Sequence, residues 1–120
     1  MTYFDMATIE GNATRDPVLK TTRTGKNVCS FSLAVNHYSK DDSEPKVSFI
    51  DVDTWDKLAE ICSDGVKKGR RVMVMGTLRQ ERWEGQDGKK QSRIKIVGKE
   101  VRFPEAVKMR DPEQLERKAG

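Results

Sequence analysis

The sequence predicts an all-β protein, a five-stranded Greek-key barrel with one short α-helix between its third and fourth strands. Three observations lead to this prediction. Apolar and polar residues alternate with a period of two along five segments, which is typical of half-buried strands. Glycine, proline and Asp-Gly pairs separate these segments. One stretch between the third and fourth segments instead has helical spacing.

The composition is that of one small basic domain. The chain has 120 residues, of which 35% are hydrophobic and 35% charged, and we expect the domain to span residues 1–107. The net charge of +4 favours an anionic partner. No apolar run approaches the roughly 18 residues of a membrane span, and the first residues do not resemble a signal peptide, so we expect a cytoplasmic protein. Cys29 and Cys62 form no Cys-X-X-Cys pair and are expected to be reduced core residues.

The first two strands are expected at residues 6–13 and 28–38. The first ends before Asp16-Pro17, because proline cannot donate to a strand ladder. The second alternates regularly, and Tyr38 falls on its polar face. Its apolar face consists of Cys29, Phe31, Leu33 and Val35.

The third strand, residues 47–55, places its aromatic residues opposite its aliphatic ones. Ile50 and Val52 share the face that suits the core, which leaves Phe49 and Trp55 on the outer face. Large exposed rings need a partner. In a basic protein, an unstacked nucleic acid strand suits both the rings and the charge.

The helix follows at once. Its apolar residues recur at offsets of three, four and eight, Asp56 is expected to cap its start, and Gly69 is expected to provide its left-handed end.

The last two strands, residues 71–83 and 92–103, form a hairpin that turns at Asp87-Gly88. Val97-Gly98 interrupts the alternation of the fifth strand, as a β-bulge does. Gly11 and Gly76 lie in the middle of strands and suit the coiling of a small barrel.

This order of elements is that of the OB-fold, which binds oligonucleotides across its second and third strands and with its hairpin loops. An open five-stranded sheet is the alternative.

Several short motifs resemble the bacterial and phage single-stranded DNA-binding proteins. They run in the family's order from about Ile9 to Phe103. They are Gly11-Asn12 with Asp16-Pro17, Phe31-Ser32-Leu33-Ala34-Val35-Asn36, Trp55-Asp56-Lys57-Leu58-Ala59-Glu60, Lys68-Gly69, Val72, Val74-Met75-Gly76, Leu78, Trp83 and Asp87-Gly88. The resemblance implies an OB-fold that coats single-stranded DNA in replication, repair or recombination, without enzymatic activity or a cofactor, usually as a homotetramer, in a bacterial cell or phage-infected host.

The resemblance also implies stacking residues, at Phe49, Trp55 and Trp83. Tyr38 is a fourth candidate, shifted by one position from the family's aromatic residue; the alternative is that it packs only on the following loop. For Trp55 the alternative is a half-buried residue that covers the start of the helix.

Clusters of cations supply the expected phosphate contacts, and a solvated surface is the alternative for each member. The expected contacts are Arg79, Arg82, Lys89, Lys90, Arg93 and Lys95 around the hairpin, and Arg15, Lys20 and Arg23 near the first loop.

Asp51 and Asp53 share the face of Phe49 and Trp55, where carboxylates repel phosphates. They either pair with Arg79 or Arg93 across the sheet, accept hydrogen bonds from bases, or line a subunit contact. Together with Asp56 they also suggest a metal-dependent nuclease. No other residues complete an active site, and the single histidine, His37, is expected to be structural, so we predict neither an enzyme nor a metal site.

Two further alternatives concern partners. An OB-fold can bind RNA, or a protein within a replication or recombination complex, in place of single-stranded DNA. We also expect a homo-oligomer, a tetramer or a dimer, with Tyr3, Phe4 and Met6 near its contact. Residues 108–120 are expected to be a short charged tail. They contain no acidic motif of the kind that recruits partners in bacterial relatives.

Overall fold

The computed structural model describes residues 3–37, 44 and 46–104. The described part of the chain holds six strands and one helix. In chain order they are β1 (Ala7–Ala13), β2 (Val18–Thr21), β3 (Asn27–His37), β4 (Lys46–Trp55), α1 (Asp56–Gly65), β5 (Arg71–Glu84) and β6 (Lys90–Arg102). The expected boundary between residues 107 and 108 lies outside the described residues.

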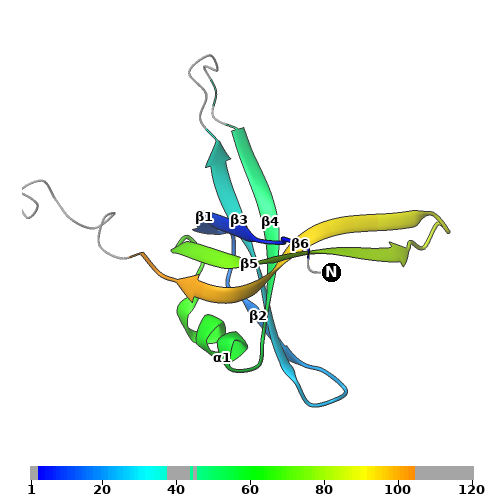
Figure 1. Ribbon diagram of the computed structural model, residues 1–120, viewed down its shortest axis with the longest axis horizontal. Coiled ribbons are helices and arrows are strands. Elements are labelled where there is room, and N and C mark those ends of the chain that lie inside the picture. The colour runs from blue at the N-terminus through cyan, green and yellow to red at the C-terminus, as the bar shows by residue number, and fades with distance from the viewer. Residues whose placement is uncertain (1–2, 38–43, 45, 105–120) are drawn as a thin grey trace, which may run out of the picture.

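The strands form one sheet that closes on itself. Its order is β1-β5-β6-β4-β3-β2, and an additional pairing of β1 with β3 completes a ring of β1, β5, β6, β4 and β3. All pairs are antiparallel except β4 with β6, where Val52 lies beside Ile96. Two strand pairs, β3–β4 and β5–β6, extend beyond the ring as arms (Figure 1). This closed ring with a helix between β4 and β5 confirms the predicted OB-fold.

The sixth strand, β2, was not predicted. Pro17 interrupts the chain as expected, but pairing resumes at Val18, which lies opposite Ser30. Because β1 pairs with the same edge of β3 further along, at Ala13 and Leu33, β1 and β2 are successive segments along one edge of the barrel. All four residues of β2 are exposed, so its sequence has no alternation that indicates a strand.

Both mid-strand glycines lie where backbones approach closely. A Cβ atom on Gly11 would lie 2.6 Å from the carbonyl oxygen of Ala34, at the point where β1 leaves β5 and joins β3. The bulge in β6 is offset from its predicted site: Gly76 pairs with Gly98 and Met75 with Glu100, so the extra residue is Lys99.

The core fills the ring, and α1 closes one end of it (Figure 1). Fully buried side chains include Leu33, Val52 and Val74, and α1 adds Ala59 and Cys62. Cys29 and Cys62 are both buried and free, as predicted.

The two ends of α1 differ from the prediction. Trp55 is the N-cap residue and no side chain caps the helix; Asp56 is its first residue and has a positive φ of 58°, a region that aspartate tolerates better than most residues. The helix ends at Gly65, where the Val66 N–H donates to the Cys62 carbonyl over 2.9 Å. Gly69 does adopt the left-handed conformation, with φ of 85°, but in the turn that precedes β5.

Within the described residues, no helix is both long and apolar enough to cross a membrane.

Candidate nucleic-acid interface

Three aromatic side chains are exposed on the strands beside the barrel. Phe49 and Trp55 project from the outer face of β4 and are 69% and 38% exposed, and Trp83 on β5 is 45% exposed. The predicted separation of aromatic and aliphatic residues onto the two faces of this strand is confirmed, because Val52 on the opposite face is completely buried. Trp55 is also the N-cap residue of α1, and it is the least exposed of the three aromatic residues. Tyr38 lies outside the described residues.

The β5–β6 hairpin continues the same surface. Trp83 pairs with Gln91 and Glu81 with Arg93, and residues directly opposite in an antiparallel pair project from the same face. The Arg93 guanidinium lies 5.7 Å from the centre of the Trp83 ring and 3.4 Å from a carboxylate oxygen of Asp51 on β4. Arg93 thus connects the hairpin to β4. We call this surface the aromatic face; it comprises Phe49, Asp51, Asp53, Trp55, Glu81, Trp83, Arg93 and Lys95.

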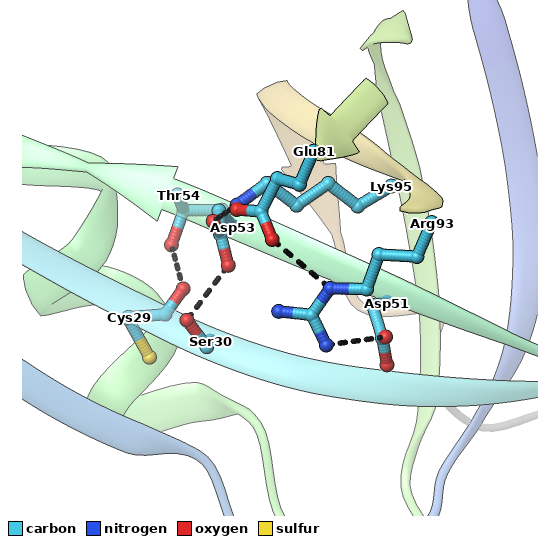
Figure 2. A network of polar contacts seen from close by, with 8 residues as sticks. All are labelled: Cys29, Ser30, Asp51, Asp53, Thr54, Glu81, Arg93 and Lys95. Atoms are coloured by element: carbon cyan, nitrogen blue, oxygen red, sulfur yellow. Dashed lines mark hydrogen bonds and ion pairs between the residues drawn. The ribbon is translucent and has the colours of Figure 1, made fainter. Parts of the chain in front are cut away.

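A network of ion pairs crosses the aromatic face (Figure 2). Lys95 is bound to both Asp53 and Glu81, and Glu81 Oε2 accepts a second hydrogen bond from Arg93 Nε over 3.0 Å. Asp53 also accepts from the Ser30 hydroxyl over 2.7 Å. The pairing of Asp51 with Arg93 is one of the alternatives left open by the sequence. Asp53 pairs instead with Lys95.

This network determines the charges on the face. Hydrogen bonds from Lys95 and Arg93 lower the pKa of Glu81. Burial alone would lower the pKa of Lys95, but its hydrogen bonds to Asp53 and Glu81 outweigh burial and raise that pKa. Glu81 and Lys95 are therefore both charged at neutral pH.

A shallow groove of about 250 Å³ lies on the aromatic face and brings distant cations together. Arg15 precedes β2, Lys20 lies within β2, and Arg93 comes from β6. Ser30 and Ser32 on β3 also line the groove, although neither was predicted as a site residue. Their position in the polar phase of β3, beside the carboxylates of β4, is the signal that could have identified them.

The other predicted cations divide between two sides of the hairpin. Arg79 pairs with Lys95 and shares the aromatic face. Arg82 and Lys90 lie at alternate positions along the hairpin strands and so project from the opposite side to Arg79 and Lys95. Together with Trp83 they line a second groove of about 590 Å³. Arg82 also donates a hydrogen bond to Gln80 over 3.0 Å. Lys89 lies at the hairpin turn, and Arg23 lies in the turn between β2 and β3.

Lys95 differs in its surroundings from the other predicted phosphate contacts. Its side chain is 12% exposed and two carboxylates already bind its ammonium group. This environment favours a supporting role for Lys95 in the sheet over a contact with a phosphate.

The geometry also bears on the nuclease alternative. Within the part of the chain that the structure describes, no group of three or more histidine, cysteine, aspartate or glutamate residues is placed to hold a metal ion. The carboxylates of Asp51 and Asp53 are engaged by Arg93 and Lys95. His37 is exposed and shares a hydrogen bond of 2.8 Å with the Ser48 hydroxyl, which agrees with a structural role.

A closed OB-fold ring with exposed rings on β4 and β5, and with cations on β2 and the β5–β6 hairpin, defines a protein of the oligonucleotide-binding class. The model of the single-strand binding protein family matches residues 4–104, and the chain belongs to this family. The family is one of non-enzymatic DNA-binding proteins, which removes the nuclease alternative.

Similar proteins come from several bacteria. A single-stranded DNA-binding protein of Caldanaerobacter subterraneus subsp. tengcongensis is 40% identical over 96 residues, covering 79% of this chain and 64% of the relative. A protein of the same description from Treponema pallidum is 40% identical over 95 residues, covering 78% of this chain and 53% of the relative. The chain thus spans less than two thirds of the length of either relative.

A solved structure, described as a Plasmodium falciparum SSB complex with ssDNA, has the same fold. It superposes with a TM-score of 0.80 at 21% sequence identity and covers 88% of this chain and 98% of its own.

Proposed function

We propose that this chain binds single-stranded DNA without sequence preference, by stacking bases on the aromatic face. The observation that carries the proposal is the exposure of Phe49, Trp55 and Trp83 on one continuous surface of an OB-fold. Buried rings would belong to the core. Rings that remain exposed beside a basic groove suit the flat faces of unpaired bases.

Stacking accounts for both affinity and tolerance of sequence. A base stacked on an aromatic ring is worth about 1–3 kcal/mol, and every base has such a face. Phe49 and Trp55 are six residues apart on β4, which corresponds to about 20 Å along an extended strand. The two rings therefore suit different bases of one strand.

Phosphate contacts supply the second part of the affinity. Arg15 and Lys20 line the groove on the aromatic face, and Arg79 extends the positive charge along the hairpin. We further propose contacts from Arg23 and Lys89 in the two turns, and from Arg82 and Lys90 where the strand passes to the other side of the hairpin. Duplex DNA binds weakly by this mechanism, because its bases are stacked on each other and not available to the rings.

The biological role follows from family membership. We propose that the protein protects single strands during replication, repair or recombination in the cytoplasm of a bacterial or phage-infected cell. Residues 1–107 would provide the binding domain, and residues 108–120 would form a short charged segment.

Assembly into a tetramer or a dimer is also part of the proposal. Tyr3, Phe4 and Met6, which precede β1, are all exposed. Separately, Met73 and Met75 line a small groove on the outer surface of β1, β5 and β6, and such an apolar surface suits another copy of the chain. Light scattering tests this: a mass near the monomer value of 13.7 kDa excludes the oligomer.

Titration of tryptophan fluorescence with oligo-dT tests the function. We expect quenching that saturates at a definite site size, weakens with salt and is absent with duplex DNA. Equal binding of duplex and single strand without quenching would refute the proposal and favour a protein partner for the aromatic face. Stronger competition by poly-U than by poly-dT would identify RNA as the ligand.

A further inference from the structure

Arg93 is held in a defined position on the aromatic face. Its Nε donates to Glu81 over 3.0 Å, its Nη1 lies 3.4 Å from Asp51, and its guanidinium lies over the Trp83 ring at 5.7 Å. Bases stack on arginine planes as well as on aromatic rings. Arg93 therefore adds a second planar group for stacking next to Trp83, provided that the guanidinium keeps its position over the ring.

Glu81 is itself held in place by Lys95. Lys95 binds Glu81 and Asp53 simultaneously, and Asp53 is anchored to β3 by the Ser30 hydroxyl over 2.7 Å. Figure 2 shows the resulting chain of contacts from β3 through β4 to the two strands of the hairpin. At one end of this chain of contacts, the side chains of Lys95 and Asp53 are enclosed, at 12% and 14% exposed. At the other end, the side chain of Arg93 is 52% exposed.

We propose that Glu81 and Lys95 are positioning residues for single-stranded DNA binding: Lys95 fixes Glu81, and Glu81 holds Arg93 beside Trp83. This inference rests on the proposed function and extends it, because neither residue contacts the nucleic acid. It also explains why a carboxylate is placed among the residues that receive a polyanion.

Charge and positioning predict opposite effects when Glu81 is neutralised. If electrostatic attraction of the phosphates is the only effect, removing a negative charge from a surface that binds DNA tightens binding. If Glu81 positions Arg93, the same change weakens binding, because Arg93 must then be ordered each time a strand binds. Ordering one long side chain costs enough to lower affinity about two- to tenfold.

The first experiment compares Glu81→Gln with the wild-type protein in titrations with a dT oligonucleotide of about 16 nucleotides at several salt concentrations. We expect the variant to bind about two- to tenfold more weakly, with an unchanged dependence on salt. Unchanged or tighter binding would overturn the inference. Asp64→Asn is the control: Asp64 is an exposed carboxylate at the end of α1, away from the aromatic face.

Arg93→Lys, alone and with Glu81→Gln, tests whether Glu81 acts through Arg93. Lysine keeps the charge but lacks the planar guanidinium. We expect the double variant to bind no more weakly than Arg93→Lys alone, whereas additive losses would contradict the inference.

Lys95→Met provides the last comparison, made at a temperature where thermal unfolding shows that the variant is folded. We expect weaker binding and an unchanged salt dependence. A decrease of about 0.7 in the slope of log affinity against log salt would show that Lys95 neutralises a phosphate, which contradicts the inference. Failure of the wild-type protein itself to bind dT would instead refute the proposed function, and the positioning role with it.

Discussion

The carbonyl oxygen of Val97 on β6 lies so close to Gly76 on β5 that a Cβ atom at Gly76 would come within 2.0 Å of it. The contact occurs beside the bulge at Lys99, where the register of the two strands shifts. The obstructing atom belongs to the backbone of a paired strand, so it cannot move without disturbing the hairpin.

Gly76→Ala is therefore expected to destabilise the fold by about 3 kcal/mol or more, as overpacking against backbone does. The midpoint of urea unfolding measures this effect. Gly85→Ala is the control, because its Cβ would come closest to the Asp87 side chain, at 3.1 Å, and would meet backbone only at an ordinary 3.5 Å. Equal stability of the two variants would show that the strands separate at Gly76 without cost.

Loss of a stacking ring is expected to weaken DNA binding and leave the fold intact. Trp83→Ala or Phe49→Ala should lower affinity for oligo-dT by about 5- to 150-fold, the equivalent of about 1–3 kcal/mol. Fluorescence anisotropy of a labelled oligonucleotide measures this. Ile94→Ala is a suitable control, since Ile94 is an exposed apolar residue that alternates with Arg93 and so projects from the other side of the hairpin. A similar loss in the control would mean that the strand does not follow the aromatic face.

The cations of the groove are expected to change the salt dependence of binding. Each phosphate contact to a single strand contributes about 0.7 to the slope of log affinity against log salt. Arg15→Gln with Lys20→Gln should reduce the slope by about 1.4. Lys67→Gln should leave it unchanged, because Lys67 is exposed in the segment between α1 and β5 and lines no groove on the aromatic face. If the double variant kept the wild-type slope, Arg15 and Lys20 would belong to a solvated surface only.

Sequence periodicity was sufficient to predict the five strands of the closed ring. What it did not predict has physical reasons. The strict alternation in β3 and β4 reflects one buried and one exposed face, so it predicted both the core residue Val52 and the exposed Phe49. β2 has no buried face and therefore left no pattern. The partners of Asp53 could not be read from the chain either. Ser30 lies opposite Asp53 through the pairing of β3 with β4, and Lys95 comes close through the parallel pairing of β4 with β6 that closes the barrel.

The start of the helix shows a second limit. Asp56 has the residue type of a cap and the correct place in the periodic pattern, yet β4 runs directly into α1 and leaves Trp55 as the N-cap residue. Residue type alone cannot distinguish a cap from a first helical residue in a left-handed conformation.

Stability should fall at alkaline pH because of Cys29. Burial, together with the nearby Cys62 and Asp53, raises the pKa of this thiol from 9.0 to about 11. Below pH 9 the thiol is protonated in both the folded and the unfolded chain, and its contribution to stability is fully present. Between pH 9 and about 11 the unfolded chain releases the proton while the folded chain retains it, so that contribution is lost as pH rises. Two pKa units correspond to about 3 kcal/mol. Urea unfolding at pH 8 and pH 11 should show a loss of this order that is smaller in Cys29→Ala, since the variant has no thiol to titrate; parallel curves for the two proteins would contradict the assignment.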